Sequence, residues 1–246
     1  MTDKTPTTIV TGSGSGIGFD VARAFLDRGG NVVLNGRNPD KLAAAAAQLG
    51  AGERIATVAG DIGERTTGEA LVNTALERFG RVDILVNNAG TFGTCAFVDV
   101  TEAELDGYLD GNLRGTYLTT QAAVRQMQKQ GSGGAVVNIG TVLIDHAIGG
   151  LPASAPLVSK GGIHALTHSL AAELAADRIR VNMVAPGIVR TPLHAQAQVD
   201  DFGGIALLNR VGEVSEIADA VLYLSDAEFV TGHILPVDGG FVTGRS

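Results

Sequence analysis

The chain has 246 residues, 45% of them hydrophobic, which is enough to bury one substantial core. A formal net charge of −8 argues against nucleic acid or an anionic membrane as the partner, because both favour a basic surface. Cys95 is the only cysteine, no apolar run is long enough to span a bilayer, and the polar start MTDKTPTT lacks a signal-like segment, so we expect a cytoplasmic protein without disulfides.

Short apolar segments alternate with longer segments of helical spacing. The apolar segments are rich in Val and Ile, as in strands buried on both faces: 7–12, 31–36, 54–60, 82–90, 134–140 and 179–187. The segments of helical pattern are 16–29, 38–50 and 68–80, each ending in Gly, then 101–129 and 159–177. This alternation predicts right-handed βαβ units, a doubly wound parallel sheet and a single domain over 1–246.

Two of these helices carry further signals. Thr101 and Glu104 form a capping-box pattern at the start of the fourth helix. In 159–177, apolar residues recur at helical spacing and predict a buried stripe: Ile163, Leu166, Leu170 and Leu174.

A glycine-rich loop separates the first strand from the first helix. It contains Gly12, Gly14, Gly16 and Gly18, which permit a tight turn and a close backbone approach to a ligand. The helix that follows offers free N–H groups and the positive end of its dipole to an anion. A glycine turn without a ligand is the alternative, but the position after an N-terminal strand favours dinucleotide binding.

The spacing Thr-Gly-x-x-x-Gly-x-Gly of this loop resembles that of the short-chain dehydrogenase/reductase family. The resemblance continues almost end to end, through the NNAG sequence 87–90, Asp61 in GDI, Asn112 in GNLRGTY, Pro186-Gly187 with Thr191, and the C-terminal segments 210–226 and 230–240. It implies a single-domain α/β Rossmann fold, in which helices flank a doubly wound parallel sheet of about seven strands. It also implies a homodimer or homotetramer with 101–129 and 159–177 at the interface.

The resemblance implies a nicotinamide dinucleotide as cofactor. The end of the second strand has Gly36 where an NAD-type Asp is usual, followed by Arg37, which suits a 2′-phosphate. NADP(H) is therefore favoured, with NAD(H) or a merely solvated Arg37 as alternatives, since Ser15 replaces a second basic residue. The expected cofactor-binding residues are Gly12, Ser13, Ser15, Gly16, Ile17, Gly18, Arg37, Asp61, Ile62, Asn88, Ala89, Gly90, Lys160, Pro186, Gly187, Val189 and Thr191.

The implied catalytic set is Asn112, Thr141 and Lys160. In the family, a Tyr four residues before the Lys exchanges a proton with the substrate, but that position is Pro156 here, which has no ionisable proton. The other tyrosines of the chain match other parts of the family pattern. Thirteen residues after Thr141 comes Ser154, so we expect the loop 142–155 to be two residues longer than usual.

Several groups are candidates for the missing proton donor. His146 and Ser154 lie in or after the lengthened loop, and His194 lies in the expected substrate lid, about 190–212. Lys160 acting through water along Asn112 is a further route. The sequence does not choose among them.

We therefore expect an NAD(P)-dependent oxidoreductase. It would transfer hydride between nicotinamide and a small-molecule substrate, a carbonyl, alcohol or activated C=C or C=N compound. The alternative is a catalytically silent dinucleotide-binding sensor or partner subunit. We expect no metal, because His164 and His168 lack the Glu of a zinc pair and no third ligand is apparent.

Overall fold

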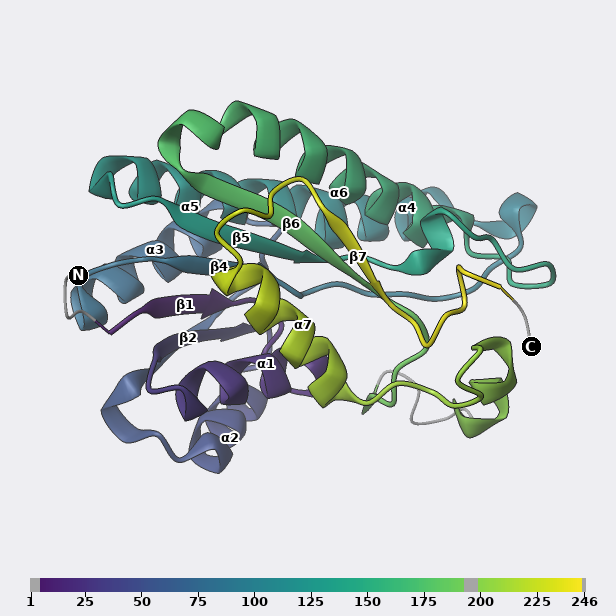
Figure 1. Ribbon diagram of the computed structural model, residues 1–246, viewed down its shortest axis with the longest axis horizontal. Helices are drawn as coiled ribbons and strands as arrows, with labels where there is room; N and C mark the ends of the chain where they lie inside the picture. The colour runs from purple at the N-terminus through teal and green to yellow at the C-terminus, as the bar shows by residue number, and fades with distance from the viewer. Residues whose placement is uncertain (1–4, 193–198, 245–246) are drawn as a thin grey trace.

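The structure, a computed structural model, describes residues 5–192 and 199–244. Seven parallel strands form one sheet in the order β3-β2-β1-β4-β5-β6-β7, so the sheet is doubly wound as predicted (Figure 1). The strands are β1 (Thr7–Val10), β2 (Asn31–Gly36), β3 (Ile55–Ala59), β4 (Ile84–Asn87), β5 (Gly134–Ile139), β6 (Ile179–Pro186) and β7 (Ile234–Val237).

Helices cover both faces of the sheet. The helices are α1 (Gly16–Asp27), α2 (Pro39–Leu49), α3 (Arg65–Phe79), α4 (Glu102–Tyr108), α5 (Gly115–Gln130), α6 (Ser154–Glu173) and α7 (Val214–Asp226). Figure 1 shows α1 and α7 on one face and α3, α5 and α6 on the other. Within the described ranges, no helix is both long and apolar enough to cross a membrane.

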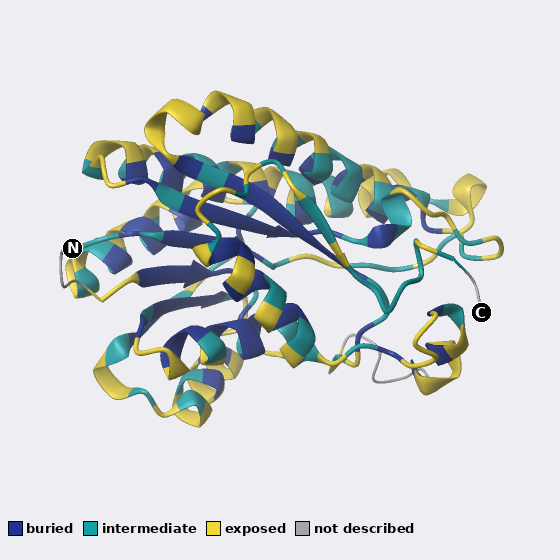
Figure 2. Cartoon of the chain, viewed as in Figure 1, coloured by how far each residue is buried: buried dark blue, intermediate teal, exposed yellow. Residues whose placement is uncertain are grey.

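The central strands are buried on both faces, as their lack of polar alternation predicts (Figure 2). Neighbouring residues of one strand enter different cores: Val10 packs with the α1 and α7 side, whereas Ile9 packs with the α3 and α5 side. The same division separates Val137 from Val136 on β5. One sheet therefore carries two hydrophobic layers, which makes the carboxyl ends of its strands a rigid edge.

The local signals for helix ends are confirmed. Gly50 and Gly80 adopt the left-handed conformation directly after α2 and α3, with φ of 64° and 78°. At the start of α4, the Glu104 backbone N–H donates to Thr101 Oγ1 and the Thr101 N–H donates to the Glu104 carboxylate. This reciprocal pair is the predicted capping box.

The helix expected at 159–177 has different bounds. It begins at Ser154, because Pro156 lies in its first turn, where the backbone N–H that proline lacks has no partner within the helix. It ends at Glu173, and Ala175–Asp177 form a separate 3₁₀ turn. The expected loop 142–155 is correspondingly shorter, and its first part is a 3₁₀ turn at Val142–Ile144.

Other boundaries also differ from expectation. The helix expected at 101–129 contains a π turn, Leu109–Arg114, between α4 and α5. β1 and β4 end at Val10 and Asn87, earlier than expected, because the residues that follow leave the ladder and bond to one another across the sheet edge.

Candidate functional site

The expected site residues gather at the carboxyl ends of the parallel strands. β1 and β4 are neighbours, and the chain leaves this pair toward opposite ends of the sheet, which defines the switch point where doubly wound folds bind ligands. The segments after these strands carry the residues expected to bind cofactor: 12–18, 37, 61–62, 88–90 and 186–191.

The glycine loop leaves room for a ligand and needs its glycines. Gly12 has a φ of 63°, and a Cβ there would lie 2.7 Å from the Ala89 Cα. A Cβ on Gly18 would collide with the Asn88 amide, whereas one on Gly14 would meet no atom within 4 Å. The first turn of α1 has neither a side-chain cap nor an acidic residue, so its N–H groups remain available to an anion.

Hydrogen bonds tie the glycine loop to the end of β4. The Asn88 side-chain amide donates to the carbonyls of Thr11 and Gly12, at 2.9 and 3.0 Å. The backbone N–H groups of Asn88 and Ala89 both donate to Thr11 Oγ1, at 3.0 Å. Asn88 therefore holds the loop against the sheet.

The segment after β6 reaches the same loop. A Cβ on Gly16 would lie 3.7 Å from the Thr191 Cβ, so residues far apart in sequence meet across the switch point. Pro186 ends β6, Gly187 packs closely on Asp238, and Val189 is buried. His194 lies outside the described residues.

The residues after β2 and β3 form the other end of this edge. Arg37 is exposed, and among the described residues no carboxylate forms an ion pair with it. Asp61 is exposed as well, and its Oδ1 accepts a hydrogen bond from the Gly63 N–H at 2.9 Å. Ile62 is buried against Gly115 at the start of α5. A cation and a carboxylate thus face solvent beside the glycine loop.

The π turn brings Asn112 to the centre of the site. Its Nδ2 donates to Ser159 Oγ at 2.9 Å and to the Thr91 carbonyl at 3.0 Å. Its Oδ1 accepts from the Thr91 N–H at 2.8 Å. Both hydrogens of this buried amide group are therefore donated within the protein, and its bonds fix α6 to the segment after β4.

Lys160 lies one residue beyond this contact, on the adjoining part of α6. Its ammonium donates to the carbonyls of Gly140 and Ile139, at 3.2 and 3.4 Å. Burial lowers the pKa of Lys160 to about 8 from its ordinary value of 10.5. The half-buried Thr141 follows Gly140 directly, and its Oγ1 accepts from the Leu143 N–H. Thr141 and Lys160 therefore occupy the same corner of the site.

The predicted substitutes for the missing tyrosine are spread apart. Pro156 is buried in the first turn of α6, where its carbonyl accepts from Ser159 Oγ at 2.8 Å. Ser154 is half-buried at the first residue of the same helix. His146 is exposed, and its ring contacts the ring of Phe241 with the centroids 6.2 Å apart.

Sequence reasoning missed three contributors to this geometry. Thr91 acts through its backbone, which has no signal in the sequence. Ser159 was noted only as the residue before Lys160, yet it links Asn112 to Pro156. Asn35 on β2 donates to the carbonyls of Val58 and Gly60 and so binds two strand ends together.

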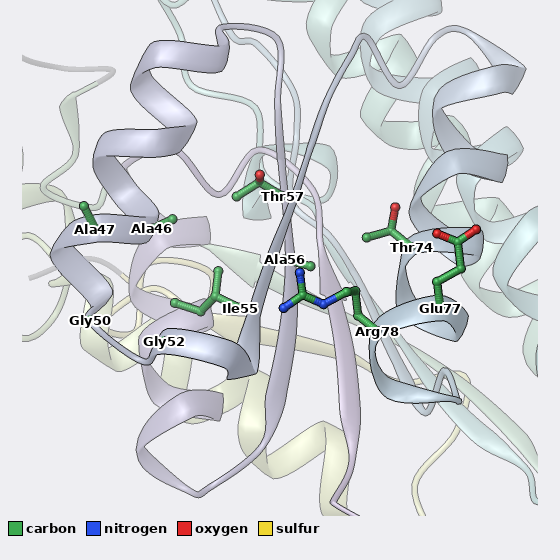
Figure 3. A pocket seen from close by; sticks show the side chains of 10 residues that line it. All are labelled: Ala46, Ala47, Gly50, Gly52, Ile55, Ala56, Thr57, Thr74, Glu77 and Arg78. Carbon is green, nitrogen blue, oxygen red and sulfur yellow. The ribbon is translucent and has the colours of Figure 1, made fainter.

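A hollow of about 600 Å³ lies elsewhere, between α2, β3 and α3 (Figure 3). It is lined by Ala46, Ala47, Gly50, Gly52, Ile55, Ala56, Thr57, Thr74, Glu77 and Arg78. These residues belong to the start of β3 and the ends of two helices, which lie at the amino-terminal edge of the sheet. The expected site residues lie at the opposite edge, and we base the site on them.

A glycine loop and an uncapped helix start lie at the switch point of a doubly wound sheet, and the half-buried Lys160 lies at the end of the neighbouring strand β5. This fold, with a glycine loop at its switch point, is that of the doubly wound dinucleotide-binding proteins.

Comparison with known proteins gives the family. A family model described as enoyl-(acyl carrier protein) reductase matches residues 12–242. The chain is 38% identical over 245 residues to a 3alpha-hydroxysteroid dehydrogenase of Mediterraneibacter gnavus, covering 96% of each chain. In an alignment of 254 positions, it is 35% identical to an L-rhamnose 1-dehydrogenase (NAD(P)(+)) of Azotobacter vinelandii. This alignment covers 98% of this chain and 97% of the other.

A solved structure agrees with these relatives. The short-chain type dehydrogenase/reductase from Mycobacterium marinum superposes with a TM-score of 0.92 at 30% identity, covering 98% of this chain and 97% of that one. The chain therefore belongs to the short-chain dehydrogenase/reductase family, and it is an oxidoreductase of the NAD(P)-dependent type.

Proposed function

We propose that this protein is an NADP-preferring reductase or dehydrogenase with an altered proton donor. It would transfer hydride between nicotinamide and a small carbonyl, alcohol or activated C=C or C=N substrate. The observation that carries the proposal is Lys160, which is held by two backbone carbonyls next to Thr141 at the carboxyl edge of the sheet. Besides any contact with the nicotinamide half, an ammonium group beside the Thr141 hydroxyl suits a site where the substrate exchanges a proton.

Different residues at the carboxyl edge of the sheet would bind different parts of the dinucleotide. The free N–H groups at the start of α1 would bind the pyrophosphate, and the open space beside Gly14 admits its close approach. Arg37 would bind the 2′-phosphate, and the exposed Asp61 would contact the adenine. The segment 186–191 and Lys160 would hold the nicotinamide half.

The dinucleotide, when bound, supplies a hydride at its nicotinamide ring. The protein's residues then have three tasks: to orient the acceptor, to exclude water and to provide a proton. The Thr141 hydroxyl accepts from the Leu143 N–H, and among the described residues it donates to none, so its proton is available to a substrate. Lys160 supplies positive charge beside it, and Asn112 fixes the helix that carries Lys160.

We further propose a lid over about 190–212 and an oligomer built on α5 and α6. Arg190 is the lid's anchor: it pairs with Asp200, in the 3₁₀ helix Val199–Ile205, and with Glu213, directly before α7. Tyr117 on α5 and Val158 on α6 are exposed apolar residues suited to a homodimer or homotetramer contact. The lone thiol Cys95 suits a cytoplasmic location.

Titration with NADPH and NADH, followed by absorbance at 340 nm against ketones, imines and quinones, tests the proposal. We expect tighter binding of NADPH and turnover with at least one compound class. Binding without turnover would favour the silent sensor or partner subunit, and absence of binding by either nucleotide would overturn both functions.

A further inference from the structure

Tyr108 is a phenol at the edge of this site that the sequence pattern assigned to no role. It is the last residue of α4, one helical turn before Asn112, and it is half-buried. Its hydroxyl faces Gly93: a Cβ built on Gly93 would lie 2.6 Å from the Tyr108 Oη. Gly93 follows the expected cofactor segment 88–90, so the phenol reaches the wall of the site.

Two contacts bring this phenol level with Pro156. Asn112 and Ser159 are hydrogen-bonded at 2.9 Å, which sets the register between α6 and the helix that carries Tyr108. These helices run in the same direction, since each crosses back from one parallel strand to the next. Tyr108 lies four residues before Asn112 and Pro156 three residues before Ser159, so both lie on the N-terminal side of this contact, and α4 packs against α6.

The second contact lies on the other side of the phenol. The Cys95 N–H donates to the Pro152 carbonyl at 2.8 Å, which ties the segment containing Gly93 to the segment that leads into α6. The segment 91–95, beside the Tyr108 hydroxyl, is therefore tied to Asn112 at Thr91 and to the start of α6 at Cys95.

The Tyr108 hydroxyl is available to a ligand. Within residues 5–192 and 199–244, no group forms a hydrogen bond with it. A tyrosine hydroxyl that is partly withdrawn from water usually finds a polar partner. Its partner here would be the substrate.

We propose that Tyr108 is the catalytic proton donor and takes the place of the tyrosine absent at Pro156. The proposal rests on the proposed oxidoreductase function. In reduction of a ketone, the carbonyl carbon accepts a hydride from the reduced nicotinamide, and the C=O π electrons move to oxygen. The oxygen takes the Tyr108 proton, and the resulting phenolate regains a proton from solvent. Alcohol, oxidised nicotinamide and neutral Tyr108 are the balanced result.

The other candidates within the described residues fit this role less well. Ser154 and Thr141 carry alkyl hydroxyls, which are far weaker acids than a phenol. His146 is exposed, and its ring is in contact with Phe241. The Lys160 ammonium is held by two backbone carbonyls. Tyr108 combines an acidic hydroxyl with a position facing the site.

Substitution Tyr108→Phe tests the proposal by turnover. It removes one oxygen and keeps the ring that packs on Gly93. We expect kcat for ketone reduction to fall by about 10²- to 10⁴-fold, with NADPH affinity unchanged. Tyr223→Phe, at an exposed position on α7, is the control and should keep full activity. A Tyr108→Phe variant with wild-type kcat would overturn the proposal and leave the proposed function standing.

A second measurement needs no turnover. The chain has three tyrosines, so 13Cζ-tyrosine labelling gives three NMR signals, which the Tyr108→Phe, Tyr117→Phe and Tyr223→Phe variants assign. We expect NADP+ to shift the Tyr108 signal alone, because a proton donor must lie within a few ångströms of the nicotinamide. If NADP+ binds and this signal does not move, the proposal is wrong, whatever the turnover. Binding without turnover in the wild type would instead contradict the proposed function.

Discussion

Folding changes the pKa of Lys160, the ammonium group at the carboxyl edge of the sheet. Its pKa falls from 10.5 to about 8, because burial disfavours the charged form. Between these two values the unfolded chain binds more protons at this side chain than the folded chain does. Its contribution to the free energy of unfolding therefore rises with pH across that window, and below about pH 8 its effect is constant and destabilising.

Comparison with a Lys160→Met variant isolates this contribution. We expect the free energy of unfolding of the wild type, relative to the variant, to increase as the pH rises from about 8 to about 10.5. Urea unfolding at several pH values measures it. A difference that stays constant would mean that Lys160 titrates normally in the folded protein, and one that decreases would mean that folding raises its pKa; either result would contradict the prediction.

Arg37 is the residue on which the choice of dinucleotide depends. A charge-assisted hydrogen bond to a 2′-phosphate contributes about 1.5–3 kcal/mol, so Arg37→Glu should weaken NADPH binding about 10- to 100-fold. NADH binding should hardly change. Fluorescence titration measures both, with Arg78→Glu, at the opposite edge of the sheet, as the charge-matched control. Equal losses for the two nucleotides would show that Arg37 acts without contacting the 2′-phosphate.

At the scale of the elements, the glycine loop makes a prediction that separates folding from binding. A Cβ on Gly14 meets no protein atom within 4 Å, so Gly14→Ala should change stability by less than about 0.5 kcal/mol. The same methyl group would occupy space that the pyrophosphate needs, so NADPH affinity should fall at least about tenfold.

Thermal unfolding and NADPH titration of the same preparation test this separation. Gly107→Ala is the matched control, because a Cβ on this α4 glycine also meets no atom within 4 Å and lies outside the loop. Unchanged NADPH affinity in Gly14→Ala would mean that the pyrophosphate does not occupy the space beside Gly14.

The elements themselves were largely predictable from the sequence. The strands that line both cores are continuous apolar runs, and glycines and the Thr101 capping box marked helix ends correctly. The start of α6 was missed because the helix was expected to begin at Ser159, after Pro156, although a proline is tolerated in the first turn of a helix. The π turn at 109–114 was missed because the periodicity of the side chains does not encode it.

The gathering of the expected site residues was predictable where it depends on local sequence. Motifs marked the glycine loop and the residues that follow the strands, and their carboxyl-edge position follows from the alternation of strands and helices. That these residues bind a dinucleotide stays a prediction. Tyr108 and Ser159 were not assigned, because their positions depend on packing between α4 and α6. Contacts between helices distant in sequence leave no pattern in a single chain.

At the scale of the whole molecule, we predict that the exposed surface of α5 and α6 forms the contact between copies of the chain in a homo-oligomer. Val158 is 61% exposed on α6, and a charge there should disrupt a contact between copies. We expect Val158→Asp to reduce the mass measured by light scattering to that of a smaller species. Arg78→Glu, on another face, should keep the wild-type mass. An unchanged mass in Val158→Asp would exclude this surface as the interface.

The central claim is that the carboxyl edge of this sheet carries out hydride transfer. Its most direct test is incubation with NADPH deuterated at both C4 positions and a panel of ketones, imines and activated alkenes, followed by mass spectrometry of the products. We predict protein-dependent reduction of at least one compound, with deuterium bound to the carbon that accepted the hydride. Tight binding of NADPH with no deuterium in any product would contradict the account.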